Sequence, residues 1–472
     1  MPQKLIVLEL NEVSLRLLRH YSILKPSSSI THLLENSLVV KTLANDVDTA
    51  DLYPSQTWAS FNTGSAYRDH EIHWYNDPKP AEYPMYWKII ADSQLSVGLV
   101  NTLHSSPASE YINQGNYKFV IPDCFSPDSF TVPAYYQNFQ ALNLKATTSN
   151  SRVTTLEIPV KEFISTIPYF HKFGITAETI FSGASLFVNI VTKKVPKERL
   201  RGLQFPLLAD IFLHQLRLES PDLSILFTNH VAANMHRYWY ALFPDDYSDR
   251  MYNSAWIEKY ENEIIISLDL ADKFFHKLIN ICQQTSSTLL ISSSMGQHAN
   301  QKLNRENTAS ETFNSKLVNV RQFVDKITAI KFNFEIRNGM WPQSSLEFSN
   351  SSDAAHCLNQ IEQAIPTLEN ISIRSLDLSS STLTFTALLD DSKESYGING
   401  KEFSAKELGF ARFEVDDHHS GCHYPDGSLI VFNSKTAKSE SATVNYLEYA
   451  PAILAHFNIA KPDYMLDPTF QI

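Results

Sequence analysis

Several classes of protein are excluded by what this 472-residue sequence lacks. Its four cysteines stand far apart and none forms a Cys-x-x-Cys pair, so it predicts neither a disulfide framework nor a zinc ribbon. Positive charge is in deficit as well. The formal net charge is -12 and no Lys/Arg-rich run offsets it, which argues against a nucleic-acid-binding surface.

Long apolar runs are also missing. No segment offers 18 consecutive apolar residues, so a transmembrane helix is not expected, and the first apolar run, Leu5–Leu8, is too short for a signal peptide. Hydrophobic residues at 43% and charged residues at 19% are ordinary for a globular protein. We therefore expect a protein of two or three structural units, made in a reducing cytoplasm.

Short apolar runs alternate with helical patterns along much of the chain. Strands are predicted at Leu5–Leu10, Ser96–Asn101, Leu223–Thr228 and Ser287–Ser292, and a helix at Ser14–Tyr21. This alternation predicts an α/β fold with a mainly parallel sheet covered by helices on both faces. Ligands of such sheets bind at the carboxyl ends of the strands.

Two stretches depart from this alternation. Residues 130–215 are rich in aromatics with a helical middle, and we expect a cap over the sheet there. Residues 301–409 begin polar, contain the link Ser349–Ser352, and predict an inserted α+β subdomain. The expected organisation is a core of residues 1–300 and 410–472 with this insertion.

The loop and helix from Tyr53 to Gly64, followed by His70, carry the clearest motif. A loop with Pro, Ser and Thr entering a helix places hydroxyls where unpaired backbone N–H groups favour an anion. Further segments follow in order: Ser224–His230 continuing to His236-Arg237-Tyr238-Trp239, Leu289–Gly296, Gly421–Gly427, and the helical run Tyr449–Leu454.

In this order and at these separations, the segments resemble the alkaline phosphatase superfamily. The similarity is greatest to its type I phosphodiesterase/nucleotide pyrophosphatase and sulfatase-like branch, over roughly residues 1–120, 220–300 and 410–472. The resemblance implies an alkaline phosphatase-like sheet. It also implies two metal ions, often zinc, and attack on the ester by a Thr, Ser or modified Cys.

The ligand positions that the resemblance implies are only partly filled. The acidic residue after the first strand falls on Asn11, and the Asp of an Asp-x-x-x-His pair falls on Ala232, although its His is present as His236. An Asp-His pair falls on Ser294-Met295, and the late His is His423. We therefore expect at most one divalent metal, Zn²⁺ or Mn²⁺, held by His230, His236 and His423. A site without metal stays open, because the imidazoles could be relics or, for His230, a residue that caps a strand.

The nucleophile position implied by the resemblance falls on Pro54, which has no hydroxyl. Ser55 and Thr57 are the available hydroxyls, and the alternative is that they cap the helix. Glu9 is a third catalytic candidate, since a carboxylate inside an apolar strand is costly unless partnered. Its partner could equally be a structural Arg or His. His236 and His423 complete the catalytic candidates, as metal ligands or as general acid and base.

Substrate contacts are expected from Asn11, His70, His73 and Lys79. The last three belong to a polar and aromatic loop suited to lining a cleft, although such loops also pack domains together. The cluster Asp416–His419 has the composition of a metal site, with a solvated loop as the alternative.

Two functions follow from these expectations. The first is an enzyme, a hydrolase or transferase that processes a phosphoester, less readily a sulfate ester, on a glycan- or nucleotide-linked small molecule. The second is a pseudoenzyme that keeps the fold to bind an anionic ligand or a partner protein. A homo-oligomer is compatible with either.

Overall fold

A computed structural model describes residues 3–46, 52–75, 77–112, 114–149, 159–301, 313–339, 343–414, 420–434 and 443–472. Its largest element is an eight-stranded sheet with the order β19-β2-β18-β6-β1-β5-β3-β4. These strands are β1 (Leu5–Leu10), β2 (Leu38–Leu43), β3 (Val97–Val100), β4 (Tyr117–Ile121), β5 (Leu223–Thr228), β6 (Thr288–Ser293), β18 (Asp426–Phe432) and β19 (Val444–Asn445). Only β18 pairs antiparallel, with β2 and β6. The predicted α/β fold with a mainly parallel sheet is therefore confirmed.

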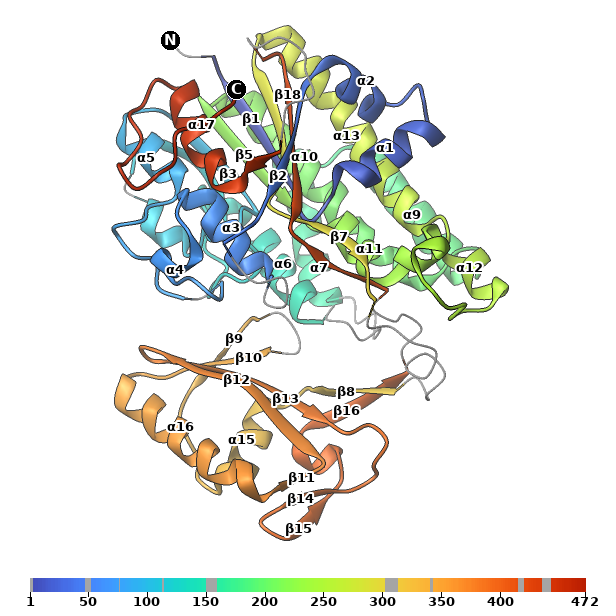
Figure 1. The fold of residues 1–472 in the computed structure, drawn as a ribbon, viewed down its shortest axis with the longest axis vertical. Helices are drawn as coiled ribbons and strands as arrows, with labels where there is room; N and C mark the ends of the chain where they lie inside the picture. Colours follow the sequence, from blue (N-terminus) through green and yellow to red (C-terminus); the bar gives the residue numbers. More distant parts are fainter. Residues whose placement is uncertain are drawn as a thin grey trace.

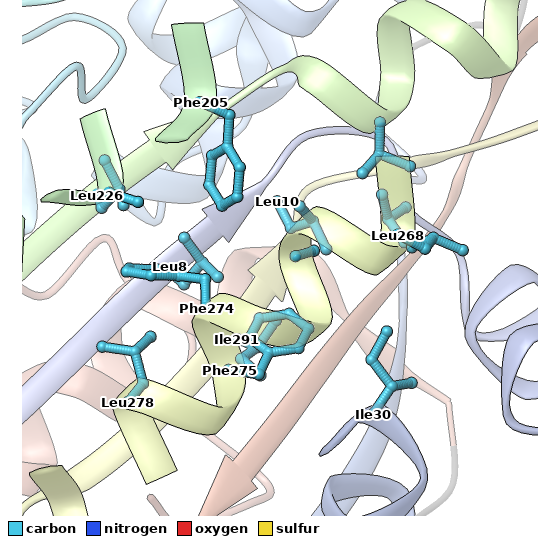
Figure 2. Packing of buried hydrophobic residues seen from close by; sticks show 14 of the residues in the cluster. Leu8, Leu10, Ile30, Phe205, Leu226, Leu268, Phe274, Phe275, Leu278 and Ile291 are labelled. Atoms are coloured by element: carbon cyan, nitrogen blue, oxygen red, sulfur yellow. The ribbon is translucent and has the colours of Figure 1, made fainter. Parts of the chain in front are cut away.

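Strand β1 lies in the middle of this sheet, between β5 and β6, and all six of its residues are buried. Alternation sends its side chains to two apolar layers. Figure 2 shows Leu8 and Leu10 in one layer, with Phe274 and Phe275 of α13 and Ile291 of β6. Leu5 and Val7 belong to the other layer. The helical cover on both sides makes a long apolar strand stable at this place.

Helices cover both faces of the sheet (Figure 1). The layer of Leu8 receives α1 (Leu15–Leu24), α2 (Ser29–Asn36), α10 (Gln204–Glu219), α11 (His230–Leu242) and α13 (Glu263–Thr285). The layer of Leu5 receives α3 (Pro54–Thr63), α5 (Tyr86–Asp92) and α17 (Tyr449–His456). Helix α3 begins at a proline, which suits a first helical position, and ends at Gly64, whose φ of 64° is the left-handed conformation that glycine adopts readily.

The stretch 130–215, expected as a cap, is mainly helical. It contains α6 (Gln137–Ser149), α7 (Val160–Thr166), α8 (Phe170–Phe173), α9 (Ala177–Val191) and the start of α10. Side chains of α10 are part of the core against the sheet. Further short elements of the larger lobe are α4 (Tyr67–His70), α12 (Ser254–Tyr260) and a two-stranded antiparallel sheet of β7 (Gly296–Ala299) and β17 (Gly421–Tyr424).

A smaller lobe, formed by residues 313–339 and 343–414, covers most of the region expected as an insertion, residues 301–409, and continues to Glu414 (Figure 1). It has its own apolar cluster, which extends from Leu317 to Phe410. Its helices are α15 (Val320–Thr328) and α16 (Ser351–Ala364). Its strands are β8 (Phe313–Leu317), β9 (Glu335–Arg337), β10 (Gln343–Glu347), β11 (Leu368–Glu369), β12 (Ile371–Ser379), β13 (Thr382–Leu389), β14 (Tyr396–Ile398), β15 (Lys401–Phe403) and β16 (Phe410–Glu414).

The two lobes touch through side-chain bonds to backbone carbonyls. Arg337 donates to the carbonyl of Pro127 at 3.3 Å, and Asn338 to that of Leu144 at 3.5 Å. None of the helices within the described ranges combines the length and apolarity needed to cross a lipid bilayer.

Candidate metal site

Three side chains from distant parts of the chain converge just beyond the end of β1. Glu12 follows β1, His236 lies on α11, and His423 lies on β17. One atom of each, a carboxylate oxygen or an imidazole nitrogen, lies within 4.8 Å of the other two. Oε2 of Glu12 is 2.9 Å from Nε2 of His236 and 3.6 Å from Nε2 of His423. We call these three residues the Glu12 group.

The fold explains why these residues meet. β1 and β5 are parallel neighbours, so the turn after β1 and the start of α11, which follows β5, lie at the same edge of the sheet. Glu12 has a φ of 60°, a left-handed conformation that is uncommon for a residue with a side chain. The antiparallel pairing of β7 with β17 places His423 opposite Gln297, and the Gln297 side chain donates a hydrogen bond to Oε2 of Glu12.

Further polar groups hold the Glu12 group in place. Nδ2 of Asn11 donates to Oε1 of Glu12 at 2.7 Å, while Oδ1 of Asn11 accepts from the indole N–H of Trp58 at 2.7 Å. Nδ1 of His236 donates to the carbonyl oxygen of Gly421 at 3.3 Å. Asn11, expected to contact substrate, is thus buried and orients the neighbouring carboxylate.

The electrostatics of the group follow from burial and from mutual attraction. Burial by itself would raise the pKa of the Glu12 carboxyl, but the charges and hydrogen bonds of His236 and His423 outweigh it and hold that pKa well below its usual range. Burial lowers the pKa of His236, and the attraction of Glu12 opposes this only in part. At neutral pH the group therefore presents a carboxylate anion and a neutral imidazole.

His230, expected as the third imidazole, is not in this group. Its Nδ1 lies 2.8 Å from the hydroxyl of Thr228, and its Nε2 donates to the carbonyl of Ser267 at 3.1 Å. Its ring stacks on Phe205 at 3.9 Å between centroids, and burial lowers its pKa to about 3. Both nitrogens are engaged at the start of α11, so Glu12 takes the third place beside His236 and His423.

The two candidate hydroxyls lie buried in the first turns of α3. Ser55 donates to the carbonyl of His73 at 2.6 Å, and the Thr57 hydroxyl lies 3.0 Å from that of Ser294. The capping residue of α3 is Tyr53, and its side chain makes no cap bond. The alternative that Ser55 or Thr57 caps this helix is therefore wrong.

The expected substrate-binding loop is tied together internally. Nε2 of His70 is 2.8 Å from the Ser60 hydroxyl and its Nδ1 accepts from a backbone N–H at 2.9 Å, while burial lowers its pKa to about 4. Nδ1 of His73 is 2.6 Å from the side-chain amide of Gln56. Lys79 donates to the carbonyl of Ser106 at 2.6 Å. These contacts fix the loop beside α3.

Glu9 lies apart from the Glu12 group in its contacts. It shares the layer of Leu5 and Val7, near Tyr86 and Tyr449, and is fully buried. Neither carboxyl oxygen has a hydrogen-bond partner among the described residues, and burial raises the pKa of this carboxyl well above its usual value. The expected cluster Asp416–His419 lies outside the described residues.

Glu12 is not among the site residues that the sequence predicts. The signal was present, because the acid that the resemblance requires stands there one position later than expected. No sequence pattern marks Gln297, since its role depends on the pairing of β7 with β17.

A cavity of about 820 Å³ is lined in part by Arg16, His298 and Asp426, and none of the predicted site residues lines it.

Comparison with known proteins finds similarity of structure alone. No protein-family model and no curated protein sequence matches this chain. Murine ectonucleotide pyrophosphatase/phosphodiesterase 5 aligns at 10% identity and a TM-score of 0.41, covering 98% of this chain and 96% of its own. Phosphonoacetate hydrolase from Sinorhizobium meliloti 1021 aligns at 11% and 0.43, covering 96% of each chain. Alkaline phosphatase PafA aligns at 11% and 0.45, covering 99% and 98%.

All three proteins are members of the alkaline phosphatase superfamily, which is the family that the motifs of this sequence resemble. Their identities and TM-scores are too low to carry an argument about the activity of this chain. Any functional inference therefore depends on the residues themselves.

Proposed function

We propose that this chain is a phosphoester-processing enzyme, hydrolase or transferase, of the alkaline phosphatase type, with a reduced site for one divalent metal. The convergence of Glu12, His236 and His423 at the carboxyl edge of the sheet carries this proposal. Two of the three stand at ligand positions implied by the order of the sequence motifs, and the third, Glu12, stands one residue after the position implied for the acid of the first strand.

The donor set fits Zn²⁺ or Mn²⁺. Two imidazole nitrogens and one carboxylate oxygen are a common three-residue set for a catalytic metal with an open position. Nε2 of His236 lies 2.9 Å from Oε2 of Glu12, and Nε2 of His423 lies 3.6 Å from it, so the three side chains offer their donor atoms to one place. A metal held there would polarise a phosphoester or lower the pKa of a bound water.

The second metal position of the family has no ligands in this chain. It falls on Ser294 and Met295, which are buried, and Ser294 contacts Thr57. Of the two hydroxyls, Ser55 gives its only proton to a backbone carbonyl, whereas Thr57 faces another hydroxyl in this same region. We therefore assign the reacting or substrate-orienting hydroxyl to Thr57.

The rival function is a pseudoenzyme that binds an anionic ligand or a partner protein. Pro54 at the position of the nucleophile and the internal hydrogen bonds of Ser55, His70 and His73 favour it. The enzyme is preferred because the donor atoms of Glu12, His236 and His423 match the three-residue set of a catalytic metal with an open position.

Metal analysis combined with an activity panel tests the proposal. Purified protein loaded with Zn²⁺ or Mn²⁺ should retain about one metal per chain after gel filtration and should cleave at least one ester among p-nitrophenyl phosphate, bis-p-nitrophenyl phosphate and p-nitrophenyl sulfate. His236→Ala should lose both properties. His298→Ala is the matched control, since His298 lies on the same strand as Gln297 but pairs with Cys422, and its ring stacks on Tyr424.

The outcomes separate the two functions. If the wild type retains metal but cleaves none of the esters, and Thr57→Ala gives the same result in both assays, the binding role is supported. Protein that retains no metal would overturn the proposed site. We also propose a reducing compartment such as the cytoplasm as the place of action, supported by four cysteines that all lie in the described ranges and form no disulfide with one another.

A further inference from the structure

Helix α9 presents an apolar stripe to solvent. None of its residues is buried, and five large apolar side chains are exposed by about half or more: Ile180, Phe181, Phe187, Val188 and Val191. Phe181 is 74% exposed and Val191 64%. Together with Ala177 and Ala184 they follow the three- and four-residue spacing that places side chains on one face of a helix.

The protein holds this helix in a defined orientation. The Thr176 side chain caps its N-terminus and also bonds Asp210 of α10, and Glu178 forms an ion pair with Lys277 of α13 at 3.0 Å. Gly183, on the less exposed flank of the helix, lies close to Leu203. The stripe therefore faces outward because the other face is attached. Figure 1 shows α9 at the periphery of the larger lobe, away from α5 and α17.

Such a concentration of exposed apolar side chains is unusual for this molecule. Of the twenty exposed large hydrophobic residues in the described ranges, nine lie between residues 160 and 191. The other four, Val160, Phe163, Ile164 and Ile167, follow the same helical spacing along α7 and the turn after it. An exposed apolar stripe such as that of α9 marks an interaction site.

The charges around the stripe indicate its partner. No acidic residue occurs between Thr179 and Lys197, although the chain as a whole has a net charge of -12. Lys193 and Lys194 are exposed directly after α9, and His171 and Lys172 are exposed before it. An apolar helical face followed directly by two exposed lysines, with Lys172 on the preceding α8 (Phe170–Phe173), matches an anionic lipid surface, where the lysines meet headgroups and the apolar side chains enter the acyl boundary.

We propose that α9 docks this protein, in the plane of the interface, on a membrane that contains anionic lipids. A second copy of the chain is the less suitable occupant. Seven residues on a 15-residue helix, about 22 Å long, fall short of the roughly 20–30 residues per side of a stable protein interface. The proposal does not depend on the metal site.

Vesicle flotation of the full-length protein tests this. The wild type should float with vesicles of phosphatidylcholine and phosphatidylserine, bind vesicles of phosphatidylcholine alone more weakly, and dissociate partly in high salt. Phe181→Asp with Phe187→Asp should reduce binding at least about tenfold, as should Lys193→Glu with Lys194→Glu. Ile23→Asp, at a 77% exposed apolar residue on α1, is the control and should bind as the wild type does.

Each contrary result has a defined meaning. A wild type that stays with the unbound fraction at every lipid composition overturns the proposal, and so does a Phe181/Phe187 variant that binds normally. If light scattering shows a wild-type dimer that this variant converts to monomers, without vesicle binding, the stripe is covered by a second copy instead. Circular dichroism and metal content of the variants check that their fold is intact.

Discussion

Two buried carboxylates, three residues apart around the end of β1, have opposite environments. Glu12 receives hydrogen bonds from Asn11 and Gln297 and faces two imidazoles, and its pKa is well below the usual value. Glu9 is equally buried, has no hydrogen-bond partner among the described residues, and has a raised pKa. Burial is the same in both, so the available partners decide which carboxylate is charged at neutral pH.

This difference reflects position in the sheet. Glu9 is still within the strand and is enclosed by the apolar layer of α3, α5 and α17. Glu12 lies beyond the edge of the sheet, where α11 contributes His236 and the paired strands β7 and β17 contribute Gln297 and His423. An anion that can hold a cation is therefore expected at Glu12, and a neutral carboxyl at Glu9. Four predictions test this contrast.

The largest effect is expected from Glu12→Gln, which removes the anionic ligand with little change of shape. Affinity for Zn²⁺ should fall by about 100-fold or more, because a neutral amide replaces a charged oxygen. Isothermal titration with the metal measures it. Glu9→Gln is the paired control and should bind Zn²⁺ as the wild type does. If Glu9→Gln lost as much Zn²⁺ affinity as Glu12→Gln, the proposed difference between these two carboxylates would be wrong.

A smaller loss is expected from Gln297→Ala. This side chain does not belong to the metal-ligand set but orients the Glu12 carboxylate, so metal affinity should fall by about 10–100-fold. Competition with a chromogenic chelator would measure this change. An unchanged affinity would show that Asn11 alone positions the carboxylate.

Glu9→Leu should raise stability. Removing a buried carboxyl without partners should increase the free energy of unfolding by about 1–3 kcal/mol at neutral pH. Because folding raises the pKa of Glu9, the folded state binds this proton more tightly. The wild type should then lose stability relative to the variant as pH rises above the unfolded value of about 4.3. Urea unfolding of the metal-free proteins from about pH 4 to about pH 8 measures the difference in the free energy of unfolding between the wild type and the variant. A difference that does not change with pH would mean that Glu9 has a partner.

The smallest effect is expected from Tyr449→Phe. The Tyr449 hydroxyl lies 3.2 Å from that of Ser292 in the layer of Glu9. Its loss should cost about 1 kcal/mol of unfolding free energy and leave metal binding unchanged. A clear effect on metal affinity would show that this layer and the Glu12 group are coupled.

The sheet was the most predictable part of the molecule. Apolar runs marked β1 and β5 with their observed bounds, because buried parallel strands are continuous apolar segments in the sequence. His236 and His423 were selected through motifs and meet in the structure.

The rest depended on contacts that no local pattern contains. Glu12 reaches the imidazoles through its left-handed backbone, and Gln297 through the pairing of β7 with β17. His230 turns to Thr228 and to the backbone of α13, which a sequence pattern does not reveal. The rings of His70 and His73 likewise find partners within their own loop and α3.

X-ray absorption spectroscopy of the zinc-loaded protein tests the central claim most directly. We predict a first coordination shell of nitrogen and oxygen with the scattering pattern of two imidazoles. This pattern should be lost in His423→Ala. A shell containing sulfur, a shell with three imidazoles, or zinc that is removed by desalting would contradict a site built from Glu12, His236 and His423.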